Sequence, residues 1–248
     1  MSTNYSPKIV TTDLVMYLDA KNSKSYPGSG DTWYDLSGNG NNGTLTNGAT
    51  ISDGTCYLDG LGVYSSDLTG GYVYVNVDTT KTNNYTDGCT WSWWMYILDS
   101  QPNGQRIFHY DSTKNHIEIK DEGASGYFRT EAALTNGYEF DPGSPPGGVP
   151  LLTWQSYAIV WDNEASPRTV KWYKNGSLFF TDGDFDDGYS GTEEYASFDS
   201  IGRAGGTVQY PYTESFYGYI PIVQVYGNKL SAAQVKQNYD ALKGRFGL

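Results

Sequence analysis

The sequence is poor in several residues on which common structural and functional classes depend. It has 2 cysteines, Cys56 and Cys89, too few for a disulfide framework, so we expect two reduced and partly buried thiols. It has 2 histidines, His109 and His116, and no nucleophile motif accompanies them, so we expect both on a sheet surface rather than in a catalytic role. Basic residues are also scarce: 16 lysines and arginines against 28 acidic residues give a net charge of −12. Such a surface repels nucleic acids and anionic membranes, and we expect neither as a partner.

Long hydrophobic runs are missing as well. The first residues, MSTNYSPKIVTTD, contain no basic segment followed by an apolar one, so we expect no signal peptide. No apolar stretch is long enough to span a bilayer, which argues against membrane insertion. The run Asn42-Gly43-Thr44 fits an N-glycosylation acceptor, but without a secretory signal we interpret it as a turn.

Aromatic and turn-forming residues are abundant. Aromatics make up 16% of the chain, with 23 tyrosines and 7 tryptophans, and there are 30 glycines. This composition favours strands and loops, and the Asn175-Gly176 pair predicts a type I′ hairpin. β-rich runs bounded by turn residues predict strands at 14–19, 55–58, 72–77, 90–98, 106–110, 116–120, 126–131, 155–161, 169–173, 177–180 and 217–226. So many strands in one chain predict an all-β fold of two packed antiparallel sheets.

The predicted strand at 90–98 is apolar on both faces. Because side chains alternate, Trp91 and Trp93 face one side and Trp94 and Tyr96 the other. A sandwich strand normally has one wet face, so something must cover the outer one. A folded-over loop, a partner subunit and a ligand are the three alternatives.

One helix is predicted near the C-terminus. Ser231 and Gln234 form a capping box, and Leu230 and Val235 occupy the positions of a hydrophobic staple. The apolar stripe of Val235, Tyr239 and Leu242 predicts that the helix docks on the sandwich, with Gly244 as its stop. We therefore expect an N-terminal arm at 1–12, a β-sandwich at 13–229, and a docked helix and tail at 230–248.

Seven segments together resemble a known family. They are LVMYLD at 14–19, WYDLSGNGNNGTL at 33–45, LDG at 58–60, and the runs 90–95, 154–161, 170–176 and 217–232. In order and spacing they resemble the concanavalin A-like lectin/glucanase (laminin G-like) superfamily. The resemblance implies a concanavalin A-like jelly-roll sandwich of two antiparallel sheets with a short C-terminal helix. The opening and the LKGRFGL ending also look like phage virion proteins, which implies synthesis in the host cytoplasm and assembly into the virion.

The enzymes of this family carry paired glutamates in a pattern like E-x-D-x-x-E. The nearest stretch here is 118–122, where the acids are wrongly spaced and a lysine stands between them, so we expect no catalysis. Asp182, Asp184, Asp186 and Glu193 have the offsets of EF-hand oxygen ligands and are candidates for a calcium site. Asp187 replaces the glycine that such a loop requires, so the preferred interpretation is a solvated acidic loop. Against the metal, Pro221 and Ile222 stand where the family usually has acids. Proline there also indicates an edge position or a bulge.

Sugars are bound by aromatic rings beside polar groups. The candidate glycan-binding residues, in loops or on an outer face, are Trp94, Tyr96, Tyr110, Asp111, Tyr127 and Tyr212. The leading hypothesis is a virion component, either a capsid decoration or a fibre-associated protein, whose partners are other virion proteins or further copies of itself, with cell-surface glycans as a second kind of partner. The alternatives are a stand-alone carbohydrate-binding module and, more remotely, a glycoside hydrolase.

Overall fold

The computed structural model contains two antiparallel sheets and one short C-terminal helix. It describes residues 8–60, 70–75, 88–99, 104–109, 116–120, 127–131, 149–162, 164–165, 169–182, 199–203 and 215–248. The predicted all-β sandwich is therefore confirmed. Among the described residues, neither helical segment has the length and apolarity needed to cross a membrane.

The larger sheet has eight strands. They are β1 (Leu14–Asp19), β4 (Thr50–Ser52), β5 (Thr55–Asp59), β7 (Gly88–Ile97), β11 (Gln155–Asp162), β12 (Thr169–Lys174), β13 (Ser177–Asp182) and β15 (Tyr217–Tyr226). Their order is β13-β12-β11-β7-β15-β5-β4, and β1 also pairs with β15. One edge of β15 thus meets β7, and its other edge meets β5 and then β1.

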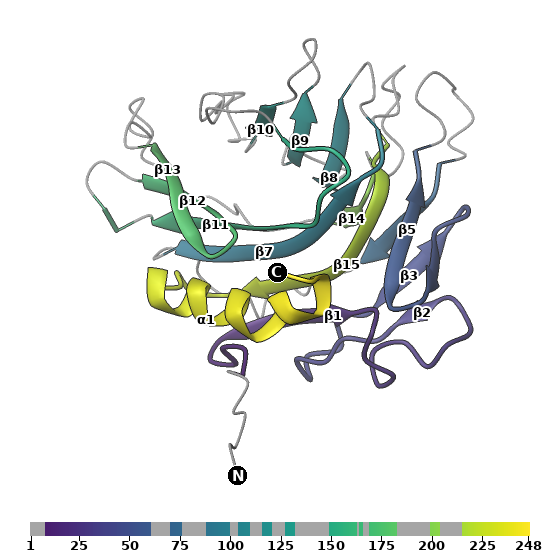
Figure 1. The fold of residues 1–248 in the computed structure, drawn as a ribbon. Helices are drawn as coiled ribbons and strands as arrows, with labels where there is room; N and C mark the ends of the chain where they lie inside the picture. The colour runs from purple at the N-terminus through teal and green to yellow at the C-terminus, as the bar shows by residue number, and fades with distance from the viewer. Residues whose placement is uncertain are drawn as a thin grey trace.

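The smaller sheet has seven strands. They are β2 (Thr32–Trp33), β3 (Gly43–Thr46), β6 (Tyr72–Val75), β8 (Gln105–His109), β9 (His116–Lys120), β10 (Tyr127–Glu131) and β14 (Ser200–Ile201). Their order is β10-β9-β8-β14-β6-β3-β2. Figure 1 shows this sheet on one side of the larger one, and α1 (Ala232–Leu242) on the other side.

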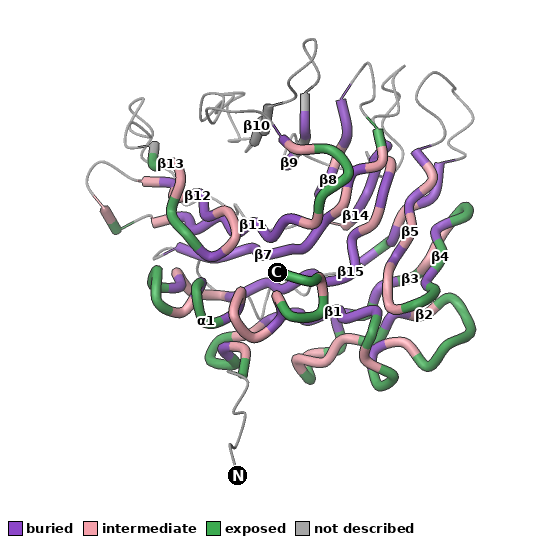
Figure 2. The backbone as a smooth tube through the Cα atoms, in the orientation of Figure 1, coloured by how far each residue is buried: buried purple, intermediate pink, exposed green. Residues whose placement is uncertain are grey.

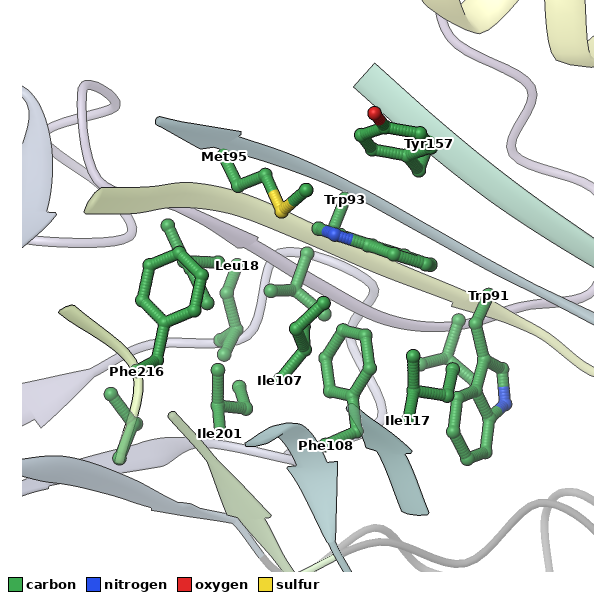
Figure 3. Packing of buried hydrophobic residues seen from close by; sticks show 14 of the residues in the cluster. Leu18, Trp91, Trp93, Met95, Ile107, Phe108, Ile117, Tyr157, Ile201 and Phe216 are labelled. Carbon is green, nitrogen blue, oxygen red and sulfur yellow. The ribbon is translucent and has the colours of Figure 1, made fainter. Parts of the chain in front are cut away.

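The core lies between the two sheets. The β7 side chains Trp91 and Trp93 point into it, and both rings meet Phe108 of β8 edge-on at 5.5 and 5.3 Å between ring centroids. Figure 3 shows Trp93 and Met95 beneath β7, with Ile107 among the side chains that face them. Figure 2 shows β7 and β15 buried along almost their whole lengths. The alternation predicted for β7 is confirmed.

The turn-rich stretch predicted after β1 has a structural role. β1 pairs with β15 along one edge, and the loop of residues 35–42 covers its other edge. The Tyr17 amide donates to Asp35 Oδ1 at 2.8 Å, and Asn41 Nδ2 donates to the Val15 carbonyl at 2.8 Å. These hydrogen bonds satisfy backbone groups of β1 that could otherwise pair with a further strand.

Several local predictions are confirmed. Asn175 and Gly176 have φ of 50° and 74°, as a type I′ turn between β12 and β13 requires. Ser231 and Gln234 form the capping box of α1. Pro221 lies where the register of β15 against β7 shifts, so it marks a bulge, and its carbonyl accepts from Ala20 N.

Two other local predictions are wrong. Gly244 does not stop the helix, because the chain continues as a 3-10 turn, η1 (Lys243–Phe246), and ends at Gly247 with φ 74°. The turn predicted at 42–44 is partly strand, because Gly43 is the first residue of β3. Glycine is required there for packing, since an added Cβ would lie 2.7 Å from Val73 Cγ1. The short strands β2, β4 and β14 were not predicted at all.

Candidate functional site

The first candidate residue, Trp94, is buried. Its ring stacks on Phe246 of η1 at 4.2 Å and on Tyr239 of α1 at 5.6 Å between centroids, and 1% of the side chain is exposed. At Trp94, the outer face of β7 is therefore covered by the C-terminal segment, rather than by the loop, subunit or ligand named as alternatives. The assignment of Trp94 to a ligand-contacting surface is corrected accordingly.

The next outward residue of β7, Tyr96, lies in a line of half-buried rings. The Cα of Tyr219 on β15 is paired with that of Tyr96 on one side and with that of Tyr57 on β5 on the other. Trp154 directly precedes β11, whose first residue, Gln155, is paired with Met95. We call Tyr57, Tyr219, Tyr96 and Trp154 the aromatic row.

The rings of the aromatic row are in contact from one to the next. Centroid separations are 5.5 Å for Tyr57–Tyr219, 6.1 Å for Tyr219–Tyr96 and 5.2 Å for Tyr96–Trp154. Trp154 also lies 4.7 Å from Phe246. Burial, followed by neighbouring tyrosines and Asp59, raises the pKa of Tyr57, so its hydroxyl stays protonated. The row is an aromatic strip on the outer face of the larger sheet, edged with tyrosine hydroxyls.

Glycine allows the central strands to approach closely within this row. Gly218 lies between two outward tyrosines of β15 and has φ 153°. A Cβ on Gly218 would come within 2.1 Å of the Tyr96 carbonyl oxygen. The close approach of β15 and β7 at this level therefore requires glycine.

A small pocket adjoins the Trp154 end of the aromatic row, beside Phe246. It has a volume of ≈ 80 Å³. Its charged lining side chains are Asp19, Lys21, Asp53 and Arg245, and the others are Thr55, Trp154, Ile222 and Phe246, with Gly54 and Pro221. We call it the polar pocket.

One wall of the polar pocket is fixed by an ion pair whose acidic partner is buried. Arg245 Nη1 donates to Asp19 Oδ2 at 2.6 Å, and the Asp19 side chain is fully buried. The Tyr17 hydroxyl donates to the same oxygen at 2.8 Å, and the Lys21 amide donates to Oδ1 at 3.1 Å. Burial acts to lower the pKa of Arg245, but the hydrogen bond and charge of Asp19 outweigh it, so the net shift is upward. Arg245 therefore carries a permanent charge that Asp19 neutralises.

The remaining candidate residues fall at or beyond the limits of the described structure. Tyr110, Asp111, Tyr212, Asp184, Asp186 and Glu193 lie outside the described residues. Tyr127 begins β10 and Asp182 ends β13, but their side chains are not among those described. Within the described part of the chain, no group of three or more His, Cys, Asp or Glu side chains is placed to hold a metal. The calcium site therefore stays a prediction.

The sequence alone does not predict most of this site. It places Tyr57, Tyr219 and Trp154 in or beside strands without indicating a role, and Phe246 in the C-terminal tail. Tyr57 and Tyr219 each lie between two buried strand residues. Because side chains alternate along a strand, this position predicts that both rings lie on the outer face of the sheet. The pairing of their strands was not readable from one sequence.

One family model and several solved structures resemble this chain. The family model described as the concanavalin A-like lectin/glucanases superfamily matches residues 67–236, more than half of the chain. No curated protein sequence matches this chain.

Solved structures with a similar fold have low sequence identity. Domain 4 of the GH43 extracellular arabinanase AbnA from Geobacillus stearothermophilus, in complex with arabinotriose, superposes with a TM-score of 0.61 and 20% identity, covering 92% of this chain and 98% of the domain. The binding domain of botulinum neurotoxin serotype C1 gives 0.61 and 13%, covering 93% of this chain and 52% of that one. Trypanosoma rangeli sialidase in complex with sialic acid gives 0.64 and 12%, with 93% and 33% covered. This chain thus spans about half of the toxin domain and a third of the sialidase, and the likeness is one of fold.

Proposed function

Because the chain belongs to the concanavalin A-like lectin/glucanase superfamily, we propose that it is a non-catalytic carbohydrate-binding domain. The observation that carries the proposal is the aromatic row beside the polar pocket. Sugar rings stack their C–H faces on aromatic side chains, while their hydroxyls exchange hydrogen bonds with charged and polar groups. Both requirements meet on the outer face of the larger sheet, where Trp154 belongs to the row and to the pocket lining.

Binding by relatives of the fold supports the proposal. Domain 4 of the arabinanase, of which the match covers 98%, was solved in complex with arabinotriose, so a domain of this architecture accompanies a saccharide in another protein. Aromatic side chains are also well suited to contact surfaces, because a ring with few rotatable bonds loses little entropy on binding.

The proposal is tested by binding to a glycan array and to insoluble polysaccharides. The wild-type chain is expected to bind, and Trp154→Ala is expected to lose at least tenfold in affinity. Tyr74→Ala is the matched control, because Tyr74 is an aromatic of β6 on the other sheet, 47% exposed. Equal binding by Trp154→Ala and the wild type would show that the aromatic row is not the surface that binds the carbohydrate.

The non-catalytic part of the proposal rests on the chemistry of the acids. Glu118 lies on β9, where the family's spacing of paired glutamates is not kept. In the polar pocket, the Asp19 carboxylate is already engaged, because its Oδ2 accepts hydrogen bonds from Arg245 and Tyr17. No release of reducing sugars is expected from any polysaccharide that the protein binds. Release that disappears in Glu118→Ala would contradict this.

The virion role belongs to the proposal as well and rests on the resemblance of the opening and closing segments. A binding domain of this kind would serve a particle as a decoration or fibre-associated adhesin, in several copies. Mass spectrometry of purified particles tests the location, and light scattering of the purified protein tests self-association. A protein that stays monomeric and never accompanies a particle would contradict the virion role.

A further inference from the structure

We infer that the aromatic row and the polar pocket bind an uncharged oligosaccharide that lies across the strands, with a terminal or branching group in the pocket. This inference rests on the proposed function and adds the class of ligand. It follows from the length of the row, the charge balance of the pocket and the contribution of the C-terminal segment to both.

The length of the row indicates an oligosaccharide. Its rings come from β5, β15, β7 and the residue before β11, which are consecutive neighbours in the sheet. Adjacent strands lie about 4.8 Å apart, so the row extends about 14 Å across the sheet. A single sugar would cover a fraction of that distance, whereas a chain of several sugars would contact every ring.

The charge balance indicates a neutral ligand. Lys21 and Arg245 supply two positive charges to the pocket lining, and Asp19 and Asp53 supply two negative ones, so the sum is zero. Arg245 is already paired with Asp19 at 2.6 Å. A carboxylate sugar would therefore have to compete with a buried aspartate for the guanidinium, within a chain of net charge −12. A hydroxyl both donates and accepts, so it can use lysine, arginine and aspartate without upsetting the balance.

The C-terminal segment completes the site. Phe246 continues the row beyond Trp154 at 4.7 Å, and Arg245, the residue before it, lines the pocket. Both belong to η1, which is held in place by the Asp19 ion pair and by the stack of Phe246 on Trp94. The segment is thus a wall of the binding site as well as a cover for the sheet.

Calorimetric titration with four linear trisaccharides tests the inference. Arabinotriose, xylotriose and maltotriose are the neutral probes and trigalacturonic acid is the acidic one, with the three neutral monosaccharides titrated alongside. At least one neutral trimer is expected to bind, and to bind at least tenfold more tightly than both its monosaccharide and the acidic trimer. Preferred binding of the acidic trimer, or equal affinity for the monosaccharide, would overturn the inference and leave the proposed function standing. No binding by any probe would overturn both.

Two variants connect the result to these residues. Tyr96→Ala is expected to weaken neutral-trimer binding at least tenfold, while the matched Tyr74→Ala is unchanged. Asp53→Asn leaves one uncompensated positive charge in the pocket, so it is expected to raise affinity for the acidic trimer several-fold with little effect on the neutral one. Melting curves of each variant show that the fold is retained. Unchanged neutral-trimer binding by Tyr96→Ala would place the ligand elsewhere and overturn the inference.

Discussion

The guanidinium of Arg245 lies 2.6 Å from the carboxylate of Asp19 and so joins the last turn of the chain to the end of its first strand. Asp19 is fully buried, whereas the Arg245 side chain is 34% exposed. Removing the arginine would leave a buried carboxylate with the Tyr17 hydroxyl but without a counter-charge.

Arg245→Met is therefore expected to lower the free energy of unfolding by about 2–3 kcal/mol, somewhat less than breaking a wholly buried pair. Urea denaturation measures the change. Lys24→Met removes one exposed positive charge and should change stability by less than about 0.5 kcal/mol. Asp19→Asn combined with Arg245→Met should recover part of the loss. A loss in Lys24→Met as large as that in Arg245→Met would show that net charge, and not the ion pair, is responsible.

Trp94 and Trp154 are expected to respond differently to alanine substitution. Trp94 is buried beneath η1, so Trp94→Ala should cost about 3–5 kcal/mol of stability. Trp154 is half-buried in the aromatic row, so Trp154→Ala should cost less stability and more carbohydrate affinity. Thermal unfolding and calorimetric titration of both variants separate the two roles, and equal stability losses would contradict the distinction.

Asp35 holds the loop that covers the edge of β1. Its carboxylate accepts from the amides of Tyr17, Ser37 and Asn41 and from the Ser37 hydroxyl. Asp35→Ala removes all four bonds and is expected to cost about 2–3 kcal/mol, since hydrogen bonds to a charged group are the stronger kind. Hydrogen exchange at the Tyr17 amide should accelerate. A Tyr17 amide as protected as in the wild type would show that another group covers this edge.

Gly218 and Gly244 offer a matched pair for alanine substitution. Gly218→Ala would place a Cβ 2.1 Å from the Tyr96 carbonyl oxygen, so we expect a loss of about 2 kcal/mol or more from the forced separation of β15 and β7. Gly244 lies in η1 with no atom within 4 Å of an added Cβ, so Gly244→Ala should be neutral or stabilise by about 0.5–1 kcal/mol. Chemical denaturation checks both, and a tolerated Gly218→Ala would mean that the two strands separate easily.

The ion pair of Asp162 and Lys229 is expected to make part of the protein's stability dependent on pH. Burial acts to raise the pKa of Asp162, but hydrogen bonding and the charge of Lys229, 2.6 Å away, outweigh burial and lower the pKa from 3.8. A carboxyl with a lowered pKa stabilises the fold above its unfolded pKa and loses that contribution as pH falls through the folded value. Lys229→Met should therefore cost about 0.5–1 kcal/mol at neutral pH, and this deficit should shrink below pH 3.8. Lys171→Met, which removes a contact of 3.9 Å to the same carboxylate, is the milder control. A deficit that is independent of pH would contradict the assignment to this ion pair.

The parts of the fold that were predictable have strong local signals. β7 and β15 are long runs with alternating or continuous apolar residues, and α1 begins at a capping box that needs no tertiary partner. The missed strands β2, β4 and β14 are two or three residues long, and they exist because neighbours supply their hydrogen bonds. Local propensity carries little information about such strands.

The candidate site is likewise only partly predictable from the sequence. Tyr96 was identified because aromatics beside polar groups suit sugars, but its neighbours in the aromatic row come from positions 57, 154 and 219. Their meeting depends on cross-strand register and on the bulge at Pro221, which one sequence does not specify. Trp94 was misassigned for a related reason: the helix was expected to dock, but not over this strand.

The position of β15 has a consequence for biosynthesis. This strand is central in the larger sheet, yet its residues, 217–226, come after every other strand in the chain. During synthesis, β1 cannot pair with β15 until most of the polypeptide has emerged from the ribosome. Until then, the apolar residues of β1 lack this partner strand. We therefore expect nascent chains that stop short of residue 217 to leave the larger sheet incomplete and its apolar residues open to chaperones.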